Sequence, residues 1–167
     1  MELVTTLAGI FEPWQSMYAD STAVSTVVMA VHLTTLLIGG GLAIAADRMT
    51  LRALRRPLAD RAFVLDELRA VHRPIVISLA LLFVSGAALA AADIEVFLAS
   101  PVFWVKIGLL ALLLVNGLVL YRTEARLGSD RTTPNDRLWR RMGLTSRLSL
   151  SLWVVIAVMG TVLTAVA

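Results

Sequence analysis

Residues 21–46 carry no formal charge over 26 positions, and this run constrains the fold more than any other feature of the chain. Asp20 and Asp47 bound it, and as a helix it is long enough to cross a bilayer. Its one titratable side chain, His32, then lies ~18 Å from Asp20 and ~22 Å from Asp47, near mid-membrane. Because a polar group in hydrocarbon needs a partner, His32 is a candidate functional residue.

The helical face around His32 is small and weakly polar. It carries residues at offsets of three, seven and eleven from the histidine: Ser25, Met29, Thr35, Gly39 and Ala43. Such a face lets another helix, or a flat cofactor, approach the backbone closely. Met29, Gly39 and the adjacent Gly40 are therefore candidate cofactor contacts. The alternative is that His32 only hydrogen-bonds a neighbouring helix.

Composition identifies an integral membrane protein and restricts its cofactors. The chain has 167 residues, of which 58% are hydrophobic, and its mean hydropathy is +0.81. Ordinary soluble domains contain about 45–50% apolar residues. The absence of cysteine excludes disulfides, thiolate metal sites, iron–sulfur clusters and haem attached through C-x-x-C-H. A cofactor must therefore be held by His, Met, Lys or oxygen ligands.

The arginines predict the orientation of the chain in the membrane. All fourteen lie in two segments, residues 48–73 and 122–147. The positive-inside rule makes both segments cytoplasmic, which places both termini outside a bacterial-type cytoplasmic (inner) membrane. Topology thus accounts for the high isoelectric point, so no nucleic-acid partner is expected, whereas contact with membrane lipids is.

Four apolar segments predict an all-α, integral membrane, antiparallel four-helix bundle that forms a single domain over residues 1–167. Pro74 is expected in the first turn of the second helix, where its missing N–H costs nothing. An amphipathic segment, residues 1–19, is expected to lie at the outer interface with Trp14 and Tyr18 at headgroup level. The expected spans are about 21–46, 74–92, 101–121 and 148–167, with cytoplasmic loops at 47–73 and 122–147.

Lys106 is the only charged residue within the third expected span. It lies ~24 Å above Arg122, while His32 lies ~22 Å above Asp47, so the two side chains share nearly the same depth. This pairing makes Lys106 a candidate catalytic residue. The alternative is that Lys106 extends to the outer headgroups, about one and a half turns away.

The two histidines are candidate metal ligands, and one such use is haem b, which needs an apolar slot and one or two axial nitrogens. His72 lies at the inner boundary, ~20 Å from the depth of His32, so the two cannot ligate one iron in regular helices. Either His32 binds alone or with Lys106 or Met29 opposite, or His72 serves a second site. The alternative for His72 is that it only caps its helix at the membrane interface.

Three segments resemble a known family: AVHLTTLLIGGGLAIAADRMTLR, ELRAVHRP and FWVKIGLLALLLVNG. They are similar to the HemJ-type protoporphyrinogen oxidases and the broader copper-resistance-D-like membrane proteins, in which a His is followed by a Gly pair and an inner-boundary arginine. The resemblance covers roughly residues 27–121. It implies a small haem-b-binding membrane protein in which His32 matches the haem-ligand histidine and Lys106 the lysine important to the oxidase.

Two readings of function follow. The first is a haem-b-binding membrane protein with a redox or electron-transfer role, oxidising a porphyrin or quinone-like substrate or serving a redox partner. The second is a non-catalytic accessory subunit of a larger membrane complex, because intramembrane polar groups are few. Metal or proton transport would require more aligned carboxylates or methionines than these segments contain. The sequence leaves open whether the chain forms a homo-oligomer and whether it is an enzyme.

Overall fold

The computed structural model describes residues 2–57, 61–129 and 135–166, and in these ranges the chain is helical with no strand. Four of its helices are long and apolar enough to cross a membrane. This confirms the expected all-α membrane bundle. The six helices are α1 (Glu2–Asp20), α2 (Thr22–Ala53), α3 (Arg61–Ala92), α4 (Ile94–Ala99), α5 (Pro101–Ser129) and α6 (Asp136–Val166).

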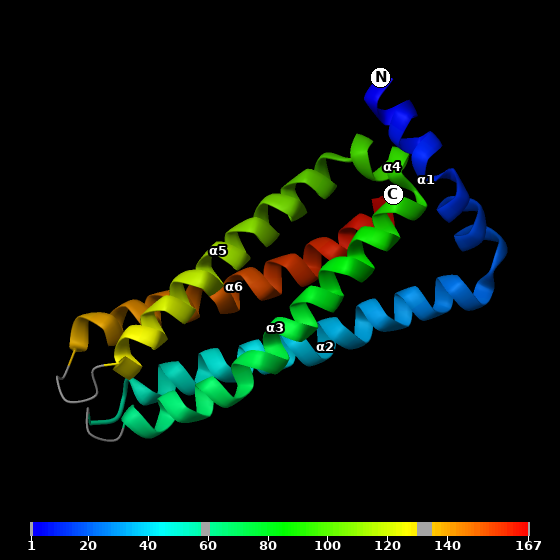
Figure 1. Ribbon diagram of the computed structural model, residues 1–167. Coiled ribbons are helices and arrows are strands. Elements are labelled where there is room, and N and C mark those ends of the chain that lie inside the picture. Colours follow the sequence, from blue (N-terminus) through cyan, green and yellow to red (C-terminus); the bar gives the residue numbers. More distant parts are fainter. Residues whose placement is uncertain (1, 58–60, 130–134, 167) are drawn as a thin grey trace.

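The four long helices form two antiparallel pairs (Figure 1). Helix α2 packs along α3, α5 packs along α6, and the pairs meet mainly through α2 and α6, while α3 and α5 approach each other little. Helices α1 and α4 and the C-terminal part of α6 gather at one end of the bundle, here called the terminal end. The opposite end, where α2 and α5 finish and α3 and α6 begin, holds the arginines and is called the arginine-rich end.

The helices extend well beyond the expected spans at the arginine-rich end. Most of residues 47–73 and 122–147, the segments that connect the expected spans, is helical, because the long helices continue into them. The reason is tertiary packing, because apolar side chains at helical spacing in both segments bury one another. The resulting cluster contains Ala46, Ala53, Val64, Leu65, Leu68, Leu127, Trp139 and Met142.

Pro74 lies inside α3, and the expectation that it begins this helix is wrong. A proline in a helix interior lacks the N–H that would bond the carbonyl four residues earlier, and it normally costs stability. The side chains of Val64, Leu65 and Leu68, before the proline, are buried. Those of Ser78 and Ser85, after it, are buried as well. Packing on both sides therefore holds α3 continuous through Pro74.

Helix α1 is attached to the bundle through the end of α3. The Trp14 Nε1–H donates to the Ala88 carbonyl oxygen at 2.9 Å, and the Gln15 Nε2–H donates to the Ala91 carbonyl oxygen at 3.4 Å. The last carbonyls of a helix have no partner within the helix. The polar side chains of α1 thus supply hydrogen bonds at the C-terminal end of α3, and Trp14 has a structural role in addition to its expected place at the interface.

Candidate functional site

His32 reaches from α2 to α3 and makes a specific hydrogen bond there. Its Nδ1 lies 3.0 Å from the Ser85 Oγ. The Ser85 hydroxyl itself donates to the Leu81 carbonyl oxygen at 2.7 Å. The imidazole contacts both the Ser85 hydroxyl and the Leu82 backbone, and these two contacts hold the ring against α3.

Gly86 leaves room for the imidazole beside this hydrogen bond. A Cβ at position 86 would lie 3.1 Å from the His32 Cε1, which is closer than almost all such contacts in proteins. Any larger residue at Gly86 would push the ring away from α3. The Ser85-Gly86 pair therefore acts as one unit, in which the serine orients the ring and the glycine admits it.

Lys106 points into the bundle rather than toward the nearer end of the molecule. Its ammonium interacts electrostatically with the imidazole of His32. Its Nζ also lies 3.6 Å from the place that a Cβ on Gly160 of α6 would take. His32 and Lys106, which the sequence placed at one depth, thus interact electrostatically, and residues of four helices lie beside this His32–Lys106 centre: α2, α3, α5 and α6.

The other predicted cofactor contacts lie elsewhere on α2. A Cβ at Gly39 would lie 2.7 Å from the Ser78 Cβ of α3, and one at Gly40 would lie 3.3 Å from the Trp153 ring of α6. Both glycines therefore lie where a neighbouring helix approaches α2 closely. Met29 is one turn before His32 and is 39% exposed, and as a neighbour on the same helix it cannot lie opposite His32 across an iron.

His72 belongs to a different part of the molecule. It lies on α3 thirteen residues before Ser85, which is ~20 Å along a helix, so the two histidines cannot ligate one iron. Its ring stacks on Tyr121 of α5 with centroids 4.6 Å apart and planes at 25°. Among the described residues no group of three or more His, Asp or Glu side chains is arranged to hold a metal ion.

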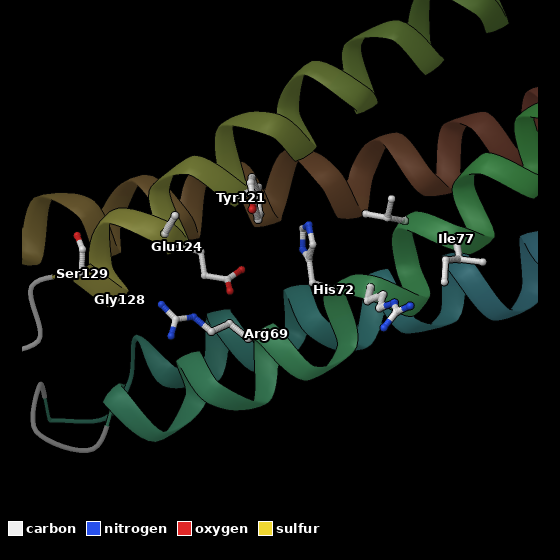
Figure 2. Close-up of a pocket in the computed structure, with 10 residues that line it drawn as sticks. Arg69, His72, Ile77, Tyr121, Glu124, Gly128 and Ser129 are labelled. Carbon is white, nitrogen blue, oxygen red and sulfur yellow. The ribbon is translucent and has the colours of Figure 1, made fainter.

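A groove between α3 and α5 at the arginine-rich end is a feature that sequence reasoning missed. It has a volume of about 780 Å³ and is lined by both helices (Figure 2). The lining side chains include Arg69, His72, Arg73, Tyr121 and Glu124. Their spacing of three and four residues on each helix was readable in the sequence, but nothing in it showed that the two faces meet.

A buried carboxyl group was also missed. Asp47 is 2% exposed, and its carboxyl group faces the hydroxyls of Ser146 and Ser149 on α6. Its Oδ2 and the Oγ of Ser146 have no hydrogen-bond partner within the described part of the chain. The sequence suggested only that Asp47 ends an apolar run, because no local signal shows that α2 continues into a packed interface with α6.

The fold defines a class, the multi-pass helical membrane proteins, and in this chain a half-buried histidine on one helix hydrogen-bonds a serine on the next. Comparison with family models, curated proteins and solved structures found no match for the chain. Assignment to a particular function therefore depends on the chemistry of the site.

Proposed function

We propose that this chain is a haem-b-binding membrane protein with a redox or electron-transfer role, in which His32 would hold the haem iron. The observation that carries the proposal is the hydrogen bond between the His32 Nδ1 and the Ser85 Oγ. A ligating histidine almost always donates its other N–H to an oxygen acceptor, which fixes the ring orientation. Ser85, on a neighbouring helix, supplies such an oxygen to His32.

The residues around His32 fit such a group. Gly86 and Gly160 leave the imidazole and the ammonium free of neighbouring Cβ atoms. Haem b would supply a one-electron redox centre. His32 would hold it, Ser85 would orient His32, and the Nζ of Lys106 would bind an anionic or carbonyl oxygen in an interior with few other polar groups. These roles suit a porphyrin or quinone-like substrate, and they agree with the HemJ-type resemblance of the segments around His32 and Lys106.

The proposal includes an orientation. The arginine-rich end would face the cytoplasm and the terminal end the outside of a bacterial-type inner membrane, because lysine and arginine are retained on the cytoplasmic side. The His32–Lys106 centre would then lie within the outer half to the middle of the bilayer. A substrate dissolved in the membrane would reach it through lipid rather than through water.

The decisive experiment is the visible absorption spectrum of the purified protein, oxidised and dithionite-reduced, after expression with ample haem. We expect a Soret band and reduced alpha and beta bands in the wild type and their loss in His32→Ala. His72→Ala is the matched control, because it removes the other histidine, ~20 Å away along α3, and should keep the spectrum.

Two results would contradict the proposal. A colourless wild-type protein at full haem supply would exclude haem binding, and stoichiometric co-purification with other membrane proteins would then favour the accessory-subunit reading. Equal loss of the bands in His32→Ala and His72→Ala, with both variants folded by circular dichroism, would show that haem binds without a specific ligand at His32.

A further inference from the structure

We propose that the groove between α3 and α5 at the arginine-rich end is a binding site for one anionic phospholipid, whose phosphate pairs with Arg69 and Arg73. The site is separate from the His32–Lys106 centre, and it stands or falls independently of haem binding. Its volume of about 780 Å³ lies within the ~300–1,000 Å³ range of small-molecule sites.

The first argument is the position of the groove along the helices. Helix α3 has no charged residue from Pro74 to Ala92, and α5 has none from Ile107 to Tyr121. The groove spans both of these boundaries, since it includes Arg69 and Glu124 on the charged side and Ile77 on the apolar side. A site at this boundary is at the depth of lipid headgroups.

The second argument is the chemistry of the lining, which changes along the groove (Figure 2). Arg69 and Arg73 present two guanidinium groups, whose planar N–H donors match phosphate oxygens. Tyr121, stacked on His72, adds a hydroxyl-bearing side chain to the lining. Val76 and Ile77 then provide an apolar wall for an acyl chain. The lining therefore suits a molecule with a phosphate at one end and hydrocarbon at the other.

Glu124 is the one acidic side chain in the groove lining, and its carboxylate offsets part of the positive charge of the arginines. It is buried and interacts electrostatically with Arg69. No ion pair within 4.0 Å forms between them, since the salt bridge found in the described residues joins Arg61 and Asp136. The groove lining therefore carries two guanidinium groups and one carboxylate, and the excess positive charge is available to a phosphate. Basic pockets between membrane helices bind anionic headgroups in this way.

The third argument is access. Helices α3 and α5 make few contacts with each other, in contrast to α2 with α3 or α5 with α6. This side of the bundle is therefore the one that packing within the chain leaves least filled. A lipid can enter it sideways from the bilayer, and its acyl chain can follow the line between the two helices.

The test is native mass spectrometry of the full-length protein in detergent, titrated with phosphatidylglycerol and, in parallel, with phosphatidylcholine. We expect the wild type to retain one phosphatidylglycerol in preference to phosphatidylcholine. The Arg69→Gln/Arg73→Gln variant should bind phosphatidylglycerol about thirtyfold more weakly, taking about 1 kcal/mol per arginine near the surface and about 1.4 kcal/mol per tenfold.

The matched control is Arg48→Gln/Arg52→Gln, which removes the same charge from exposed positions on α2 at the same end, outside the groove. It should bind phosphatidylglycerol like the wild type. Glu124→Gln should bind it more tightly, because it removes the competing carboxylate. Inorganic phosphate at millimolar concentration should not displace the lipid, since it lacks the acyl chain.

Three results would overturn the proposal. Equal weakening in the two double variants would mean that diffuse surface charge attracts the lipid. Equal retention of phosphatidylcholine by the wild type would mean that the groove does not recognise an anion. Displacement by inorganic phosphate would assign the arginines to a free phosphate rather than to a lipid headgroup.

Discussion

At the scale of single residues, the side chain that matters most beside His32 is Ser85. A serine in an apolar helix is unremarkable by itself, and its hydroxyl usually bonds a carbonyl one turn earlier. Ser85 does so, to Leu81, and its Oγ also lies 3.0 Å from the Nδ1 of His32. One hydroxyl thereby joins the histidine of α2 to the backbone of α3.

Ser85→Ala should retain haem about tenfold less tightly than the wild type and should shift the Soret band, because the ring loses the hydrogen-bond partner that orients it. The measurement is haem content and spectrum after dialysis against apomyoglobin. Ser78→Ala is the control, since Ser78 is a buried serine two turns earlier on the same helix and does not contact His32. Identical behaviour of the two variants would show that Ser85 does not position the ring.

Asp47→Asn should leave the unfolding temperature unchanged or raise it by a few degrees. A buried charge without a cationic partner is costly, and Asp47 makes no salt bridge in the part of the chain described. The amide keeps the shape and can still bond Ser146 or Ser149. Thermal unfolding in detergent measures the effect, with exposed Asp93→Asn as control. A loss of more than about five degrees in Asp47→Asn alone would show that the carboxylate is needed.

At the scale of helices, the glycines of α2 decide how closely its neighbours approach. Gly39 faces α3 and Gly40 faces α6, whereas Gly41 has no atom within 4 Å of a built Cβ. Consecutive residues on a helix point about 100° apart, so two of the three can serve two interfaces while the third faces outward. The Gly-rich segment is thus the point where α2 joins the two helices that it packs against.

Gly39→Ala should destabilise the protein by about 1–3 kcal/mol, because the added Cβ overlaps that of Ser78 and the helices must separate. Gly41→Ala is the matched control and should be neutral or slightly stabilising, since alanine favours a helix more than glycine does. Unfolding in a denaturing detergent titration measures both. Equal stability of the two variants would mean that α2 and α3 can adjust without cost.

At the scale of the whole molecule, charge and packing divide the bundle into two different ends. The arginines collect at one end together with the larger buried cluster around Trp139 and Met142. The terminal end carries α1, α4 and the His32–Lys106 centre nearby. The long hydrophobic side chains between them are largely exposed, with Leu37 at 77% as the extreme, as expected for a surface that faces lipid.

Labelling of single introduced cysteines in intact cells tests the proposed orientation. The chain has no cysteine of its own, so no other position reacts with the label. Ala99→Cys on α4 should react with a membrane-impermeant maleimide in intact cells. Ser129→Cys at the end of α5 should react only after the membrane is permeabilised. The reverse labelling pattern would show that the topology is the opposite of the proposed one. The cysteine-free wild-type chain is the control for background labelling.

The sequence determined the class of the fold. Charge-free segments long enough to span a bilayer leave only helices there, because each backbone group must be bonded within its own segment. The shared depth of His32 and Lys106 was also readable, since the rise of a helix is fixed. Helix ends and Pro74 were misjudged, because those boundaries depend on burial against Trp139 and Met142, which lie far away in the chain.

Only the tertiary structure decided which faces of these helices lie against each other. Nothing local in the sequence pairs His32 with Ser85, seats Gly39 against Ser78, or sets Arg69 and Glu124 across one groove. These juxtapositions depend on which helix faces lie opposite each other. An amphipathic pattern shows that a face is buried, but its partner is selected by side-chain packing between helices distant in the chain.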